Sequence, residues 1–114
     1  MEFSKEQTAT MLEALETFGV DKQLDIAIEE MAELTKAIIK YRRCASKETY
    51  ENLCEETADV AIMIEQIFLS TRCDNVAKYV VEKTNRLKRR VTTKKRYLYK
   101  VGADNGKAQN HNSY

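Results

Sequence analysis

The chain has 114 residues, which suits one domain, and its lack of proline and its three glycines favour long helices over a turn-rich β fold. Three cysteines without a CxxC pair argue against a disulfide framework or a structural zinc site, and they favour a reducing, cytoplasmic setting. No stretch is apolar enough to span a membrane, and the N-terminus lacks the apolar core of a signal peptide, so we expect no membrane partner.

The first two helices are predicted from capping residues and apolar periodicity. Ser4 and Gln7 have the spacing of a capping box and Gly19 is a good stop, so we expect a helix from about Ser4 to Phe18. Asp21 is a candidate N-cap for a second helix that reaches about Arg43. Apolar residues at three- and four-residue steps predict buried stripes, formed by Met11, Leu12, Leu15 and Phe18 in the first helix and by Leu24, Ile28, Met31, Leu34 and Ile38 in the second.

Two further helices and a tail complete the predicted fold. Ser46 is expected to cap a third helix from about Lys47 to Ser70, and Asp74 a fourth helix that ends near Val91. Their inward stripes are predicted to contain Leu53, Val60, Ile64, Ile67 and Phe68, and then Val76, Tyr79, Val80 and Leu87. We therefore predict an all-α, four-helix bundle-like domain over residues 1–100, followed by a polar, disordered tail over residues 101–114.

Charge is unevenly distributed along the sequence, although the formal net charge is only +1. Seventeen acidic and nine basic residues precede Lys83, whereas the segment from Lys83 to Lys100 contains nine basic residues and no acidic one. An acidic body followed by a basic section indicates an anionic ligand without identifying it.

Two acidic segments share one short pattern, Glu-Glu-Met-Ala-Glu at residues 29–33 and Glu-Glu-Thr-Ala-Asp at residues 55–59. Glu30 and Glu33 lie one helical turn apart on the same face, as do Glu56 and Asp59. Both pairs border the predicted apolar stripes, where four carboxylates repel one another unless a cation neutralises them. Mg²⁺ suits such oxygen ligands, with Mn²⁺ as the alternative. Ordinary solvated charges, including a helix pair between Glu33 and Lys36, would need no metal.

The doubled acidic motif resembles the signature of the MazG-like all-α nucleoside triphosphate pyrophosphohydrolases, in particular their compact single-domain members. Glu30-x-x-Glu33 is followed after twenty-two residues by Glu56-x-x-Asp59, and the flanking residues also agree with the family's EExxEL and EExxDV segments. The resemblance covers about residues 23–90. It implies that the four acids bind magnesium and that a nucleoside triphosphate is hydrolysed to its monophosphate and pyrophosphate. It further implies a carboxylate general base, for which Glu33 and then Glu30 are the candidates.

The resemblance also implies substrate contacts outside the acidic motifs. Lys83 falls on the apolar stripe of the fourth helix, where a lysine needs an anionic partner or a route to solvent. By resemblance, Lys83 and Arg86 contact phosphates, and Asn85 takes the role of Arg86 if the helix is rotated. Gln23 lies one heptad before Glu30 and is placed near the nucleotide, the alternative being a solvated residue of the first turn. Family members form homodimers or homotetramers, so the same is expected here.

Two other functions fit the same sequence. A phosphoribosyl-ATP pyrophosphohydrolase-like enzyme would share the fold and the chemistry. A non-catalytic helical interaction module would instead use residues 83–100 to bind nucleic acid in a salt-sensitive way. The sequence contains no recognised nucleic-acid motif, so we expect no nucleic-acid partner.

Overall fold

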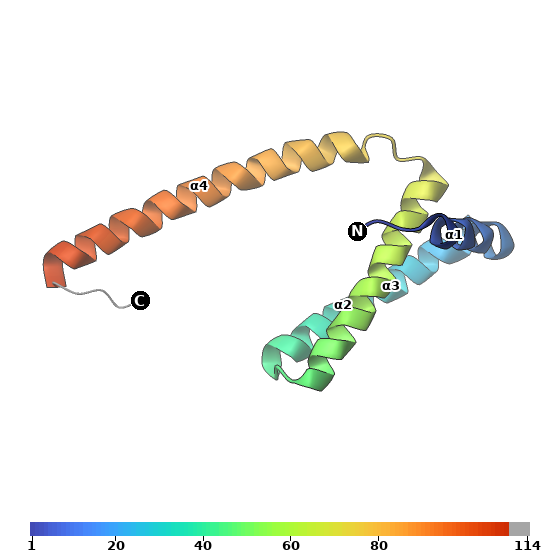
Figure 1. The fold of residues 1–114 in the computed structure, drawn as a ribbon, viewed down its shortest axis with the longest axis horizontal. Coiled ribbons are helices and arrows are strands. Elements are labelled where there is room, and N and C mark those ends of the chain that lie inside the picture. Colours follow the sequence, from blue (N-terminus) through green and yellow to red (C-terminus); the bar gives the residue numbers. More distant parts are fainter. Residues whose placement is uncertain (110–114) are drawn as a thin grey trace. The chain divides into compact units, whose positions relative to one another are not determined.

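The computed structural model describes the backbone of residues 1–109 and the side chains of residues 1–106, and over this part the chain is helical without any strand. The helices are α1 (Lys5–Phe18), α2 (Val20–Arg43), α3 (Lys47–Thr71) and α4 (Val76–Gln109) (Figure 1). The predicted all-α fold class is therefore confirmed. The chain divides into two compact units, Met1–Cys73 and Asp74–Tyr114. Within the described residues, each helix is too short or too polar to cross a membrane.

Local side-chain hydrogen bonds define where α1 and α3 begin. The Ser4 hydroxyl accepts from the Gln7 N–H at 3.1 Å, and the Gln7 side chain accepts from the Ser4 N–H at 2.8 Å. Ser46 and Thr49 form the same reciprocal pair ahead of α3. Both arrangements are capping boxes, which satisfy backbone donors that a helix start otherwise leaves free. The predicted starts of these two helices are confirmed.

The junction between α1 and α2 is tighter than predicted. Gly19 has a φ of +90°, a conformation that glycine adopts easily, and it both ends α1 and precedes α2. Because one residue turns the chain, α2 already begins at Val20, and Asp21 lies in its first turn instead of capping it. The prediction of Asp21 as the N-cap was wrong, although an acid in the first turn still suits the helix dipole.

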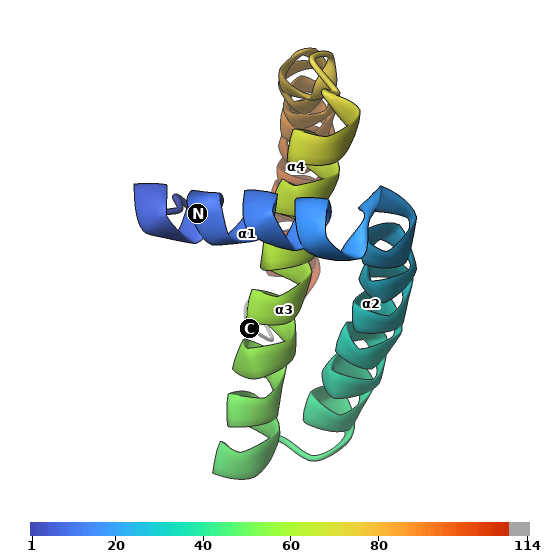
Figure 2. The same cartoon turned by 90° about the vertical axis from the view of Figure 1, so that its right-hand side faces the viewer.

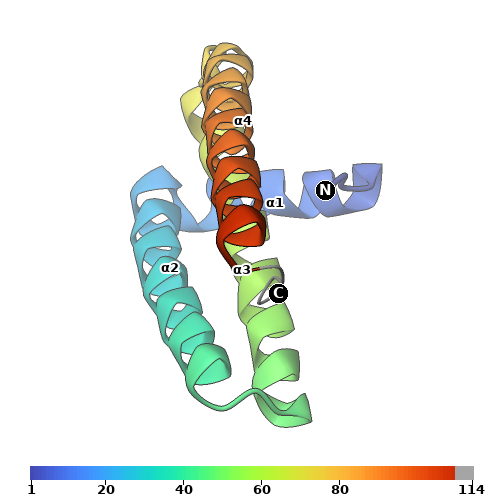
Figure 3. The ribbon, with the colours of Figure 1, turned by 90° about the vertical axis from the view of Figure 1, so that its left-hand side faces the viewer.

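The first unit is an antiparallel pair of helices crossed by a third. α2 and α3 run side by side from the connection at residues 44–46, and α1 lies across them near the Gly19 end (Figures 2 and 3). The buried apolar side chains are few and mostly small, and two buried glutamines accompany them. These residues are Met11, Gln23, Ala27, Ala37, Val60, Met63 and Gln66. The core of this unit is thus a narrow seam between α2 and α3, with α1 over one end.

The predicted buried stripes of α2 and α3 are only partly inside this seam. Val60 is buried, but Ile28 is 68% exposed, and Met31, Ile38, Ile64 and Phe68 are also exposed within the unit. The physical reason lies in Ala27 and Ala37, whose small side chains form the α2 surface that faces α3. A seam between two helices covers a narrow strip of each, so the larger apolar residues beside it remain uncovered.

The helix α4 is longer than predicted and forms its unit without another helix. It continues from Val76 to Gln109, past the expected end at Val91 and through the start of the expected tail. Lys and Arg are good helix formers and no proline interrupts the sequence, so the helix continues even through Gly102 and Gly106 near its end. The predicted domain limit at residue 100 falls inside α4 and stays a prediction, and residues 110–114 lie outside the described part.

Candidate metal centre

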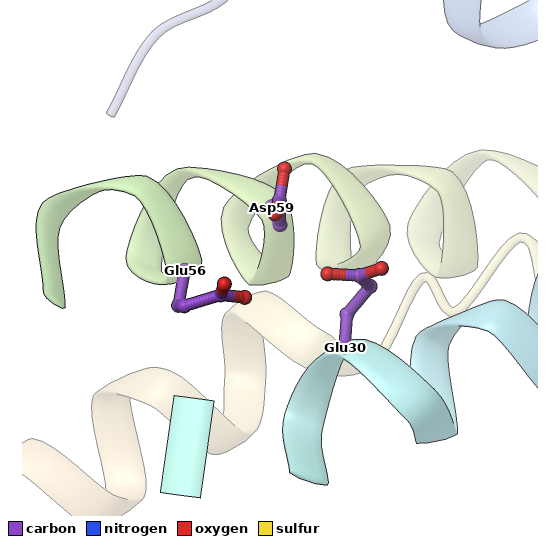
Figure 4. Close-up of side chains that lie close together, drawn as sticks. All are labelled: Glu30, Glu56 and Asp59. Atoms are coloured by element: carbon purple, nitrogen blue, oxygen red, sulfur yellow. The ribbon is translucent and has the colours of Figure 1, made fainter. Parts of the chain in front are cut away.

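Three carboxylates converge across the seam between α2 and α3. Glu30 reaches from α2 toward α3, which carries Glu56 and Asp59 one turn apart (Figure 4). One oxygen from each of the three side chains lies within 4.8 Å of the others. Glu30 and Glu56 are half-buried and Asp59 is exposed, so the cluster lies at the edge of the seam. The structure thus brings together acids from both predicted pairs.

The antiparallel course of the two helices explains this meeting. Glu33 follows Glu30 by three residues on α2, and Glu56 precedes Asp59 by three residues on α3. When one helix rises and the other descends, such pairs face each other in the order Glu30 with Asp59 and Glu33 with Glu56. One acidic pair on each helix, aligned in this way, is therefore enough to create a shared acidic surface between α2 and α3.

The environment of Glu30 disfavours its negative charge. Its partial burial raises the pKa of the carboxyl above the ordinary value, and the nearby charge of Asp59 raises it further. A hydrogen bond with the Asp59 side chain and the charges of Glu56 and Glu33 act in the same direction. Carboxylates that repel in this way are stabilised by a bound cation, which replaces repulsion with attraction.

The spacing of the three oxygens suits a small divalent cation. Mg²⁺ binds oxygen at about 2.0–2.1 Å in an octahedron, so adjacent ligands lie about 2.9 Å and opposite ligands about 4.2 Å apart. Oxygens within 4.8 Å of one another reach these separations when the side chains move together by up to about 2 Å. Glu30, Glu56 and Asp59 would hold the ion and leave further positions for water and phosphate oxygens. The chemistry and the geometry of these residues both fit magnesium.

The fourth predicted ligand, Glu33, lies outside the cluster of three. Its side chain is 52% exposed, and its Oε1 lies 3.5 Å from Nζ of Lys36, one turn further along α2. This is the helix pair that the sequence offered as an alternative to a metal role. Glu33 is nevertheless close enough to raise the pKa of Glu30. The structure therefore shows three converging acids with a fourth beside them.

Gln23 is buried, which excludes the interpretation of this residue as a solvated part of the first turn. It is 6% exposed, and its Nε2 donates to Oε1 of Gln66 at 2.7 Å. Gln66, 5% exposed, donates in turn to the sulfur of Met63 at 3.5 Å. The Gln23 Oε1 is buried without a partner among the described residues. Gln66 was missed at first, although its position seven residues after Asp59 places it on the same helix face.

The predicted phosphate-binding residues belong to α4 and thus to the second unit. Lys83 lies along the apolar face of this helix, among Val76, Val80 and Leu87. Arg86 follows Lys83 by one turn on the same side of the helix, in a group whose other residues are basic or hydroxyl-bearing: Arg89, Arg90, Thr93, Lys94 and Tyr97. Lys83, Asn85 and Arg86 are all exposed within the unit. Their contacts with substrate stay a prediction.

Comparisons with known proteins identified no relative of this chain. The sequence matches no protein-family model, and neither curated proteins nor solved structures give a significant match.

Proposed function

We propose that this protein is a magnesium-dependent nucleoside triphosphate pyrophosphohydrolase of the MazG-like all-α type, acting in the cytoplasm. The observation that carries the proposal is the convergence of Glu30, Glu56 and Asp59 across α2 and α3. These residues come from the two motif segments whose pattern resembles that family. A phosphorylated substrate supplies the anionic oxygens that complete the coordination of such an ion.

The proposed reaction hydrolyses the bond between the α and β phosphates. Water attacks the α phosphorus, the bond to the bridging oxygen breaks, and the products are a nucleoside monophosphate and pyrophosphate. A bound magnesium ion would acidify the water and offset the charge of the leaving pyrophosphate. Glu30, Glu56 and Asp59 would hold the ion, while Glu33, which lies outside the cluster, would accept the proton of the attacking water. Glu30 is the second candidate for this proton.

The basic helix α4 supports the same proposal through its charge. Unit Asp74–Tyr114 has eleven basic and three acidic residues, so its formal charge is +8, whereas unit Met1–Cys73 has eight basic and fifteen acidic ones and a charge of −7. A triphosphate needs cationic partners in addition to the metal. We propose Lys83 and Arg86 for this role, with Asn85 as the substitute for Arg86.

Self-association into a homodimer or homotetramer is part of the proposal. Ile28, Met31, Ile64 and Phe68 leave apolar surface uncovered in the first unit. Such surface on a small soluble domain favours contact with a second subunit. Light scattering of the purified protein is expected to give a mass of two or four chains, and a monomer would contradict this part of the proposal.

The decisive experiment is a nucleotide panel with a pyrophosphate readout. The panel contains the canonical ribo- and deoxyribonucleoside triphosphates, oxidised and methylated variants, and phosphoribosyl-ATP, each with and without Mg²⁺. We expect release of pyrophosphate from at least one triphosphate only when the metal is present. Preference for phosphoribosyl-ATP would assign the alternative enzyme. If the whole panel yields no pyrophosphate, while duplex DNA raises the melting temperature, the interaction-module alternative replaces the enzyme.

A further inference from the structure

We propose that Gln23 and Gln66 are positioning residues that hold α2 and α3 in the register required by the acidic cluster. The proposal rests on the proposed function, because it assigns a purpose to the register only if the cluster binds a metal. Its structural part, the fixing of two helices by one buried amide pair, can be tested without any metal.

The two glutamines and the acidic cluster share one helix register. Gln23 precedes Glu30 by seven residues on α2, and Gln66 follows Asp59 by seven residues on α3. In an antiparallel pair these equal steps mean that the alignment which joins Gln23 to Gln66 also sets Glu30 opposite Asp59. Seven residues make about two helical turns, so the amide pair lies roughly 10 Å along the seam from the carboxylates.

The hydrogen bond between these amides is the specific polar link of the seam. Over the described residues, the other side-chain hydrogen bond between α2 and α3 is the one between Glu30 and Asp59 inside the acidic cluster, and no ion pair joins the two helices. The rest of the seam consists of side chains such as Ala27, Ala37 and Val60, which pack without a directional preference. The connection at residues 44–46 joins the helices at one end, and the amide pair links them toward the opposite end, across which α1 lies. The carboxylates lie between these two restraints.

Repulsion within the cluster explains why a specific link between α2 and α3 is needed at the end away from their connection. Glu30, Glu56 and Asp59 carry like charges across the seam and drive α2 and α3 apart before a cation binds. Weak apolar contacts allow the helices to rotate or slide in response. A buried polar pair opposes this motion, because any displacement that breaks its bond leaves more amide groups without partners.

The imperfect hydrogen bonding of the pair favours a positioning role over a stabilising one. The Gln23 Oε1 is buried without a partner, which makes the pair a poorer source of stability than two apolar side chains of the same shape. Buried polar groups of this kind are best known for fixing the register of packed helices. The pair therefore restricts the sliding and rotation of α2 against α3, although two apolar side chains in its place would make the folded state more stable.

The test replaces both amides by side chains of matching shape, in Gln23→Met/Gln66→Met, with Gln23→Leu/Gln66→Leu as a second apolar pair. Mn²⁺ binding, followed by electron paramagnetic resonance of the full-length protein, reports the metal centre. We expect an unchanged or higher melting temperature and an Mn²⁺ affinity about 10-fold weaker, as for other residues that orient metal ligands. Met11→Leu, a volume-conserving change elsewhere in the core, is the packing control and is expected to leave the affinity unchanged.

A metal-free distance measurement separates the register from the proposed function. Spin labels are attached to cysteines introduced at the exposed positions Asp25 on α2 and Glu51 on α3, after the three native cysteines are replaced by serine. In chelator, we expect one narrow distance distribution for the protein with both glutamines and a broader one for both apolar pairs. An unchanged distribution overturns the register role, and a broader one with unchanged Mn²⁺ affinity overturns the link to the metal centre. If the wild-type chain binds no Mn²⁺, the proposed function fails while the distances still decide the register.

Discussion

The two units of this chain differ in how their sequences determine what they do. Unit Met1–Cys73 is acidic and has a buried seam, and its candidate metal ligands are side chains that the fold itself brings together. Unit Asp74–Tyr114 is basic, and its described residues form one helix without a packed core that would fix which of its cations act together. Packing thus selects particular residues in the first unit, whereas in the second only the pattern along the helix is available.

This contrast yields different expectations for mutations in the two units. A carboxylate that converges with others has no substitute, so its loss is expected to abolish function. A cation on α4 has many basic neighbours, so its loss is expected to be partly compensated. The following predictions test this contrast, from the largest expected effect to the smallest.

The largest effect is expected for Glu56→Gln. Removing this ligand from the cluster weakens metal binding, and a bound metal contributes several kcal/mol to the reaction, so we expect hydrolysis to fall by about 10³-fold. The adjacent Glu55→Gln is the matched control, because Glu55 is exposed and lies outside the cluster. Pyrophosphate release at saturating Mg²⁺ measures both variants. Equal activity in the two would remove the cluster from the catalytic site.

The next largest effect is expected for Glu33→Gln, in which the metal ligands remain. Loss of a general base lowers the rate by about 10²-fold or more, and we expect this loss in kcat with little change in Mn²⁺ affinity. Lys36→Met is the control, because it removes the ion pair at 3.5 Å but leaves the carboxylate in place. A fall in metal affinity instead of kcat would make Glu33 a fourth ligand, as the sequence first suggested.

A smaller effect is expected for Lys83→Ala and Arg86→Ala in α4. A charge-assisted hydrogen bond to a phosphate contributes about 1.5–3 kcal/mol, which corresponds to about 10- to 150-fold in affinity. Because neighbouring cations compensate part of the loss, each substitution should raise KM by about 10-fold, with kcat less affected. Lys78→Ala serves as the basic control nearer the start of the helix. An effect of Asn85→Ala larger than that of Arg86→Ala would show that the neighbouring helix face meets the substrate.

The features that sequence reasoning predicted well are those that depend on nearby residues. Ser4 and Ser46 cap their helices through partners three residues away, so their roles are visible in the local sequence. The i, i+3 spacing of the acids has the same local character. Burial in the seam was harder to predict, because the surface of α2 that is covered depends on how α3 approaches it. In the structure the small Ala27 is buried against α3, whereas the larger Ile28 is exposed.

The pairing of Gln23 with Gln66 was also not predictable from the local sequence. Each glutamine alone is an ordinary polar residue, and although Gln66 lies within an apolar segment, nothing in the local sequence identifies its partner. Their 2.7 Å contact joins residues 43 positions apart and exists only in the folded pair of helices. The helix α4 is longer than its apolar periodicity predicts, because Lys and Arg sustain a helix where no apolar stripe continues.

The smallest effect, expected for Glu30→Gln in the absence of divalent cations, tests whether the acidic cluster is strained before it binds metal. The folded state raises the pKa of Glu30, so this carboxyl favours folding when protonated, and that contribution is lost as the pH rises through its folded pKa. The free energy of unfolding of the wild type, relative to Glu30→Gln, should therefore fall as the pH rises. Because the group is only half-buried, the change should be a few tenths of a kcal/mol.

Urea unfolding between pH 3.5 and 7 in chelator measures this difference, with Glu29→Gln as the exposed neighbour that should show no such trend. With Mg²⁺ near neutral pH, the wild type is expected to have the larger free energy of unfolding of the two, because the ion binds its ionised cluster and stabilises the folded state. A pH-independent difference in chelator would mean that the carboxylates of α2 and α3 do not interact before metal binds. The acidic unit would then resemble the basic helix α4, in which the spacing of the charges along the sequence, and not the packing of helices, determines where they lie.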